Sequence, residues 1–302
     1  MNVISAVNLS KRYGKTNAVN NLSFDISQGE IVGFLGPNGA GKTTTLRMLA
    51  GLIKPSKGRS EILGQKVPSN SLLSVGTMIE EPSFYKYMTG RDNLRHAAML
   101  HGGVDDRYID EMLEFVSMEK AAKKRVGAYS QGMRQRLGLA RSLLWKPKVL
   151  LLDEPTNGLD PVGIAEIREN LRTIAKQGVT ILISSHILAE LEKFVERIIA
   201  VEKGSLIYDG PMNQLISQMD EAQLVYLLEA TNPEKLFASL DELGFKYENL
   251  KGQARAYIPQ TQANTLVSKL IHAGVELTQA SKETEDLEGA YLRLLKEDGR
   301  PS

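Results

Sequence analysis

The fold of this chain is decided by residues 31–44, which read IVGFLGPNGAGKTT. The apolar run Ile31–Leu35 is typical of a buried strand, and a helix pattern begins at Lys42 after a glycine-rich turn. Residues 36–43 fit G-x-x-x-x-G-K-[ST], the spacing of a loop that cradles phosphates. The order of strand, loop and helix predicts an α/β fold with a nucleotide bound at the loop.

The chemistry of this loop explains its residue types. Glycines at 36, 39 and 41 let the backbone bend until successive N–H groups converge on a phosphate, and the helix N-terminus adds partial positive charge. We expect Lys42 to neutralise the β- and γ-phosphates of ATP and the Thr43 hydroxyl to ligate Mg²⁺. The alternative is a glycine-rich turn followed by Lys and Thr by chance, but it would not explain why the motif lies between a strand and a helix. The predicted ATP-binding residues here are Gly36, Pro37, Asn38, Gly39, Ala40, Gly41, Lys42, Thr43 and Thr44.

A second motif, VLLLDE at residues 149–154, places two carboxylates at the end of an apolar strand. Ligands of open parallel sheets bind at the carboxyl ends of the strands. We expect Asp153 to hold Mg²⁺ through water and Glu154 to polarise the water that attacks the γ-phosphate. The alternative is a strand ending in two solvated acids, but the phosphate loop upstream favours a P-loop nucleotidase.

The surrounding pattern predicts a parallel sheet. Residues 149–152 and 180–184 form apolar runs with a helix pattern over 162–176 between them. Residues 4–9 and 22–26 alternate as short strands, and Leu46, Met48, Leu49 and Leu52 fall on one face of the helix after the loop. Residues 83–135 are mainly helical in pattern, with the clearest helices over 91–100 and 108–118.

A third motif narrows the class. The segment YSQGMRQR at residues 129–136 resembles the LSGGQ signature of ABC-type ATPases. Ser130 is a good N-cap for the helix that follows, and this helix end offers a second phosphate site. Gln131 replaces the first glycine of the signature, Met133 its glutamine and Tyr129 its leucine. An ordinary capped helix is the alternative reading of this motif alone.

The resemblance implies further roles. In this family two subunits bind ATP head to tail, so the signature residues of one chain act on the nucleotide of the other. Glu154 and His186 would be catalytic, Tyr13 would stack on adenine and Asp160 would lie in the D-loop. Glu80 stands where the family usually has the Q-loop glutamine and would ligate the metal with Thr43 and Asp153. The implied signature residues are Ser130, Gln131, Gly132 and Met133.

The resemblance covers about residues 3–215. In detail the chain resembles the ATP-binding subunits of bacitracin- and lantibiotic-type ABC exporters, on the segments IEEPSFY at 79–85 and EDLEGAYL at 285–292. It implies a P-loop core with an antiparallel β subdomain and a helical insert at about 83–135. We expect an ABC ATPase domain at 1–218 and a C-terminal α+β extension at 219–302, patterned βαββαβ and closed by a helix over 284–295.

Composition excludes several functions. Lys and Arg number 37 against 36 Asp and Glu, so a net charge of +1 gives no general field for a polyanion. The absence of cysteine removes disulfides and thiol chemistry, and no apolar run approaches a membrane span.

We therefore expect a cytoplasmic ATPase, peripheral on the cytoplasmic face of the membrane, that pairs with itself and with separate transmembrane permease subunits. We expect the assembly to export a peptide antibiotic, drug or similar cargo. A soluble ABC ATPase acting on nucleic acid or ribosomes remains the alternative. A P-loop kinase outside the ABC class would leave the signature and His186 unexplained.

Overall fold

The computed structural model describes residues 1–215, 224–258 and 260–283. The chain divides into two compact units, Met1–Pro211 and Met212–Ser302. The domain boundary expected at 218 lies outside the described residues. The helix expected over 284–295 and the segment 285–292 lie outside the described residues.

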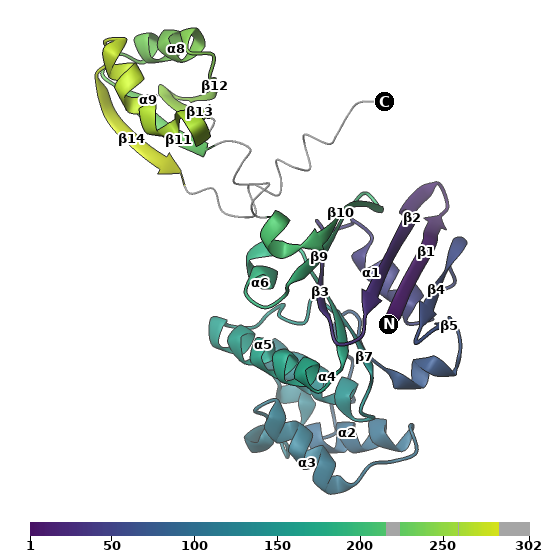
Figure 1. The fold of residues 1–302 in the computed structure, drawn as a ribbon. Coiled ribbons are helices and arrows are strands. Elements are labelled where there is room, and N and C mark those ends of the chain that lie inside the picture. Colours follow the sequence, from purple (N-terminus) through teal and green to yellow (C-terminus); the bar gives the residue numbers. More distant parts are fainter. Residues whose placement is uncertain (216–223, 259, 284–302) are drawn as a thin grey trace. The chain divides into compact units, whose positions relative to one another are not determined.

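A six-stranded sheet forms the centre of the first unit, in the order β10-β9-β3-β8-β7-β6 (Figure 1). All neighbours run parallel except β10, which is antiparallel to β9. Every residue of β7 and β8 is buried, which explains the apolar runs at 149–152 and 181–183 within them. The strands are β3 (Ile31–Leu35), β6 (Val75–Met78), β7 (Val149–Asp153), β8 (Thr180–Ser185), β9 (Arg197–Glu202) and β10 (Ser205–Pro211).

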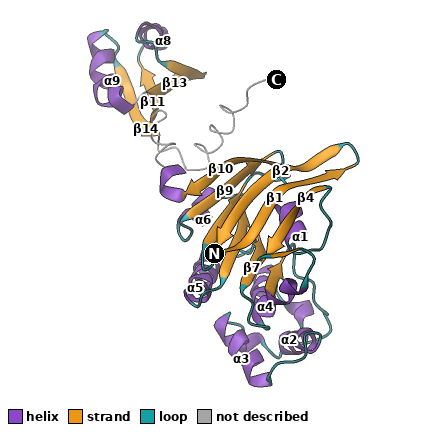
Figure 2. Cartoon of the chain, turned by 45° about the vertical axis from the view of Figure 1, so that its right-hand side comes forward, coloured by secondary structure: helices purple, strands orange, loops and turns teal. Residues whose placement is uncertain are grey.

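A four-stranded antiparallel sheet, ordered β2-β1-β4-β5, forms the predicted β subdomain (Figure 2). Its apolar face shares one hydrophobic core with the central sheet, to which Ile4, Phe24 and Phe34 contribute. The strands are β1 (Asn2–Tyr13), β2 (Thr16–Ser27), β4 (Lys57–Ile62) and β5 (Gln65–Lys66).

Helices complete the first unit. The helix after the phosphate loop, α1 (Lys42–Leu49), buries Leu46, Met48 and Leu49. Leu52, predicted on the same face, instead lies beyond the end of the helix and is 63% exposed, so that prediction is wrong. The remaining helices outside the insert are α5 (Pro161–Lys176), α6 (Leu188–Glu192) and the 3₁₀ helix η1 (Asn70–Ser74).

The predicted helical insert connects β6 to β7, and α2 and α3 lie on the far side of α4 from β1 and β2 in both views (Figures 1 and 2). Thr89 and Asp105 cap α2 and α3 with their side chains, which fixes where each helix begins. The elements are α2 (Gly90–Met99), α3 (Asp106–Phe115), η2 (Glu119–Ala121), η3 (Val126–Ala128) and α4 (Gln131–Leu143).

The second unit has the predicted βαββαβ order and its own hydrophobic core. Its antiparallel sheet is ordered β12-β13-β11-β14, so the first strand lies inside the sheet, as in a ferredoxin-like arrangement. Leu236, Leu240 and Leu266 of the two helices pack on this sheet with 0% exposure. The elements are β11 (Leu224–Ala230), α8 (Pro233–Glu242), β12 (Lys246–Leu250), β13 (Gln253–Ile258), α9 (Gln260–His272) and β14 (Leu277–Glu283).

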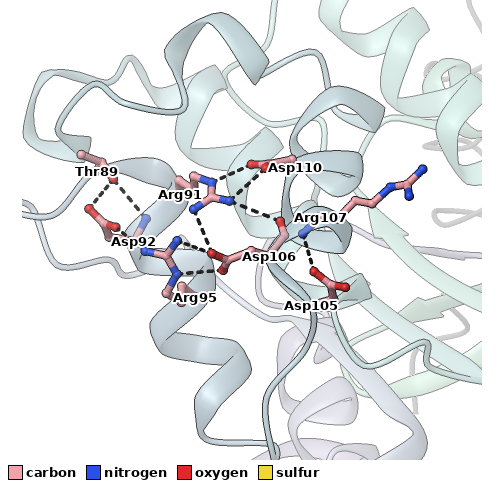
Figure 3. Close-up of polar contacts among 8 residues, drawn as sticks. All are labelled: Thr89, Arg91, Asp92, Arg95, Asp105, Asp106, Arg107 and Asp110. Carbon is pink, nitrogen blue, oxygen red and sulfur yellow. Dashed lines mark hydrogen bonds and ion pairs between the residues drawn. The ribbon is translucent and has the colours of Figure 1, made fainter.

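Two parallel arginine–aspartate pairs clamp α2 to α3 (Figure 3). Arg91 holds both carboxylate oxygens of Asp110 at 2.6 and 2.9 Å, and Arg95 holds those of Asp106 at 2.9 and 2.7 Å. Hydrogen bonds from Arg95 and Arg91 lower the pKa values of Asp106 and Asp110, respectively. The two pairs lie one helical turn apart and align the helices along the insert.

Replacing the aspartates of both pairs in one variant, Asp106→Asn together with Asp110→Asn, should therefore destabilise the insert, and the size of the effect should depend on pH. The pKa values are lower in the folded chain, so the pairs stabilise it at neutral pH and lose this contribution as the pH falls below about 4. The difference in melting temperature between wild type and variant should be largest near neutral pH and should shrink in acid. Asp105→Asn, which keeps a capping side chain, is the control. If the melting temperatures of wild type and double variant differed equally at neutral pH and in acid, the clamp would be contradicted.

Candidate functional site

The phosphate loop lies between β3 and α1, as predicted, and its backbone geometry requires glycine. Gly41 has a φ of 100°, and a Cβ atom on it would lie 2.4 Å from the carbonyl oxygen of Ala18. Any larger residue would push the loop away from β2, which carries Ala18. The close approach of the loop to β2 is thus built into the sequence.

Lys42 is 6% exposed and is held by oxygen atoms at the loop. Its Nζ donates to the carbonyl oxygens of Gly36 at 2.6 Å and Pro37 at 3.2 Å, and it lies 3.5 Å from Glu154 Oε1. Burial lowers the pKa of the Lys42 ammonium, while the nearby Glu154 and Asp153 oppose that shift. An ammonium so placed is a strong electrostatic partner for a phosphate.

Asp153 joins two elements of the site. Thr43 Oγ1 donates to its Oδ2 at 2.7 Å, and Ser184 Oγ donates to its Oδ1 at 2.5 Å. The aspartate is 7% exposed, so these hydrogen bonds compensate for removing its charge from water. Thr43 and Asp153, predicted as metal ligands, are therefore in direct contact.

Glu154 and His186 also meet. His186 Nδ1 lies 3.1 Å from Glu154 Oε2. Glu154 has a φ of 45°, a left-handed conformation that costs a non-glycine residue about 1–3 kcal/mol. Its N–H compensates by donating to the Ser184 carbonyl and hydroxyl at 3.2 and 3.0 Å. The turn directs the carboxylate back over the strand end, toward Lys42 and His186.

The signature segment forms the N-terminus of α4. Ser130 caps the helix by accepting the Met133 N–H at 3.2 Å, and Gly132 packs against Leu159. The Gln131 side chain lies against Gly158 of the same chain. Asp160, predicted in the D-loop, caps α5 by accepting the Gly163 N–H at 2.9 Å.

Like the signature residues and Asp160, Glu80 and Tyr13 have no described contact with the cluster formed by Lys42, Asp153, Glu154 and His186. Glu80 pairs with Arg47 of α1, and its side chain is 59% exposed; no described contact joins it to Thr43 or Asp153. Tyr13 is 48% exposed at the end of β1, with Lys11 Nζ 5.2 Å from its ring centre. Tyr13 is thus partly covered by Lys11 and partly open to solvent.

Sequence reasoning missed Ser184 and Arg47. Ser184 is fully buried in β8 and touches both acids, and the signal for it was a hydroxyl inside the apolar strand TILISS. Arg47 is an exposed arginine on a helix, and nothing in its local pattern distinguishes it from a solvated residue.

We also searched the described residues outside this cluster for a metal site, a large cavity and a membrane-spanning helix. Among the described residues, no group of three or more His, Cys, Asp and Glu side chains is arranged to hold a metal. A cavity of about 860 Å³ lies between the insert and the core, lined by residues such as Tyr108, Phe115 and Ile174, and none of its lining residues belongs to the phosphate loop. Within the described residues, no helix is long and apolar enough to cross a membrane.

Comparison with known proteins places the chain in a family. Residues 19–157 match the ABC transporter family. The chain is 39% identical to the bacitracin transport ATP-binding protein BcrA of Bacillus licheniformis over 97% of both chains. The chain belongs to the ABC transporter family. It is an ATP-binding subunit of this family and an ATPase.

Further relatives agree with this membership. The lantibiotic transport ATP-binding protein SrtF of Streptococcus pyogenes is 41% identical over 68% of this chain and 91% of its own. A solved ATP-binding subunit of an ABC transporter superposes with a TM-score of 0.66 at 28% identity, covering 72% of this chain and 93% of that one. The alternative of a soluble ABC ATPase acting on nucleic acid or ribosomes is not supported.

A dimeric ATP-binding cassette solved with ADP and phosphate has the same fold, with a TM-score of 0.64. It is 24% identical and covers 69% of this chain and 98% of that one. This similarity concerns the fold of the ABC ATPase domain.

Ser184→Ala should impair the ABC site without removing the phosphate loop. Loss of this buried hydroxyl leaves Asp153 and the Glu154 N–H with one hydrogen bond fewer, which should lower the free energy of unfolding by about 1–3 kcal/mol. When the ATPase rate is measured against free Mg²⁺, the Mg²⁺ concentration that gives the half-maximal rate should rise. Ser142→Ala, an equally buried serine that bonds only the Leu139 carbonyl, should lower stability but leave the Mg²⁺ curve unchanged.

Proposed function

We propose that this ABC ATPase subunit powers export, hydrolysing Mg-ATP in a homodimer that docks on separate transmembrane permease subunits at the cytoplasmic face of the membrane. The observation that carries the catalytic part is the contact of Thr43 and Ser184 with the Asp153 carboxylate, next to Glu154 and His186. Two hydroxyls, two acids, a histidine and the Lys42 ammonium thus meet at the carboxyl ends of neighbouring strands.

The described side chains fit the group that the family binds. Mg²⁺ is commonly held in proteins by one or two side-chain oxygens together with substrate phosphates, and Thr43 and Asp153 offer such a pair. When bound, the ion would neutralise charge developing on the phosphate oxygens. Lys42 and the loop N–H groups would hold the β- and γ-phosphates, and the half-exposed ring of Tyr13 would stack on the adenine.

Glu154 is the proposed group that orients the attacking water. Its Oε2 lies beside His186 Nδ1, so the histidine fixes the direction of the carboxylate. Its Oε1 lies 3.5 Å from Lys42 Nζ. A phosphate bound on the loop would attract the Lys42 ammonium away from Glu154. Substrate binding would thereby free Glu154 to accept a hydrogen bond from water.

The dimer follows from the position of the signature. Ser130 is exposed and Gly132 is half-buried at the N-terminus of α4, and a helix N-terminus is a geometry that attracts phosphate. We assign these residues, with Gln131 and Met133, to the ATP held by the partner's loop. Asp160 would contribute from the D-loop.

The proposed cargo is a peptide antibiotic or similar drug. BcrA is named for bacitracin transport and matches 97% of this chain, so the match spans both units. The SrtF match covers 68% of the chain, too little to include both units in full. The coverage favours a bacitracin-type over a lantibiotic-type cargo.

Paired variants test the ATPase part. Lys42→Ala should abolish high-affinity ATP binding, because it removes the cation that faces the phosphates, while Glu154→Gln should bind ATP normally and fail to hydrolyse it. Nucleotide titration and size-exclusion chromatography with Mg-ATP should show an ATP-trapped dimer only for Glu154→Gln. A strict monomer would contradict the composite site.

The role of Glu80 is testable by its Mg²⁺ dependence. To reach a metal its carboxylate must leave Arg47, so Glu80→Gln should keep ATPase activity with an altered Mg²⁺ requirement. Glu80→Ala should lose more activity than ATP affinity, because the phosphate loop stays intact. Three superimposable curves of ATPase rate against free Mg²⁺ would show that Glu80 stays away from the metal.

The cargo is tested in the host cell. Deleting the gene should raise sensitivity to bacitracin several-fold more than sensitivity to a lantibiotic, and the wild-type gene should restore resistance. A gene carrying Glu154→Gln should fail to restore it. Unchanged sensitivity to both antibiotics would overturn the cargo assignment and leave the ATPase intact.

A further inference from the structure

The cavity of about 860 Å³ lies at the opposite end of the central sheet from the phosphate loop. Residues 146–148, directly before β7, and residues 177–179, directly before β8, line it, whereas Asp153 and Ser184 lie where these strands end. β7 has five residues and a strand rises about 3.3 Å per residue, so roughly 17 Å separate the two places. A ligand in the cavity would therefore not overlap ATP.

The wall of this cavity is apolar and comes from three parts of the first unit. Tyr108, Met112 and Phe115 belong to α3, Ile174 belongs to α5 and Val3 belongs to β1. All five side chains are buried or half-buried. Sites for small molecules have volumes of about 300–1,000 Å³ and combine an apolar wall with a few polar groups, so both the size and the wall fit such a site.

The charged side chains at the rim of the cavity all have one sign. Lys146 and Lys148 are exposed there, and among the described residues no Asp or Glu lines the cavity and neither lysine forms an ion pair. The C-terminal ends of α3, α4 and α5 also reach the cavity, each with roughly half a negative charge, which together is less than the two lysine charges. The rim therefore favours an anion.

Lys146 is placed beside the apolar wall by an unusual backbone conformation. Its φ is 49°, where glycine or asparagine is the usual residue after a helix, so the turn itself does not call for a lysine. Its Nζ lies 4.9 Å from the ring centre of Tyr108, within reach of a cation–π contact. The Tyr108 hydroxyl donates to the Leu143 carbonyl at 3.3 Å, which orients the ring. A positive charge thus stands at the edge of an aromatic wall.

We propose that this cavity binds a single-chain amphiphile with an anionic head group. The chain would lie against α3 and α5, and the head group would lie at Lys146 and Lys148. The site is independent of the proposed function, because none of its residues belongs to the phosphate loop or the signature. A fatty acid and a single-chain phosphate ester share this chemistry and differ in the head group.

Calorimetric titration of the full chain with dodecanoate, below its micelle concentration, tests the proposal. Dodecanoate should bind at one molecule per chain, and decanoate should bind roughly fifteenfold more weakly, because each buried methylene strengthens binding about fourfold. Dodecanol should bind more weakly than dodecanoate, and dodecyltrimethylammonium should not bind. Dodecyl phosphate identifies the head group: tighter binding than dodecanoate assigns a phosphate ester, and weaker binding assigns a fatty acid.

Paired variants locate the head group. Lys146→Gln with Lys148→Gln should weaken dodecanoate binding roughly three- to tenfold, through the loss of two exposed ion pairs, and should leave dodecanol binding unchanged. Lys123→Gln with Lys124→Gln removes two exposed lysines that do not line the cavity, and this matched control should bind both ligands as wild type does. Met112→Trp should fill the cavity and abolish binding of both ligands, with ATP titration showing that the variant is folded.

The outcomes separate this site from the ATPase site. The proposal is overturned if dodecanoate does not bind, if dodecyltrimethylammonium binds as tightly, or if the two double-lysine variants bind dodecanoate equally. Lys42→Ala should lose ATP binding and keep dodecanoate binding. Loss of dodecanoate binding in Lys42→Ala would place the amphiphile at the phosphate loop and would also overturn the cavity assignment, while leaving the proposed ATPase intact.

Discussion

The carboxylate of Asp153 is the point on which the site depends, because it joins the carboxyl ends of three neighbouring parallel strands. It ends β7, its Oδ1 accepts from Ser184 of β8, and its Oδ2 accepts from Thr43, which follows β3 through the phosphate loop. A buried carboxylate without these donors would be expensive, so the register of the three strands and the position of the loop are tied to one charge. Apolar packing holds the strands together, and this carboxylate aligns their ends.

The alignment of the strand ends also sets the conformation of the next residue, Glu154. With Asp153 fixed, Glu154 turns into a left-handed conformation and is stabilised there by two hydrogen bonds from its N–H to Ser184. Ser184 thus orients both acids, one through its hydroxyl proton and the other through its acceptor oxygens. The left-handed backbone conformation of Glu154 is unfavourable in itself, and it occurs at the position where the carboxylate contacts Lys42 and His186.

The sequence predicted elements best where the pattern was local and strong. The apolar runs of β7 and β8, the phosphate loop and the βαββαβ order of the second unit all follow from periodicity and spacing. β4 and β6 were not expected, since KGRSEI is polar and VGTM is only four residues long; each is a strand because a neighbour supplies its hydrogen bonds. Leu52 was misplaced because the helix ends at Leu49, and the Arg47 and Ser184 contacts depend on residues far away in the chain.

The departures from the family motifs carry the most information about this particular chain. Glu80 stands in place of a neutral glutamine and pairs with Arg47 on the phosphate-loop helix, while the adjacent Glu81 pairs with Arg134 on the signature helix at 3.2 Å. Two successive acids therefore contact α1, which follows the phosphate loop, and α4, which begins at the signature segment. In each pair the glutamate side chain is exposed, at 59% and 60%, while the arginine is half-buried, so each pair is partly solvated and contributes modestly to stability. These solvated pairs differ from the contacts of Asp153, which is 7% exposed and therefore depends on its donors to remain charged.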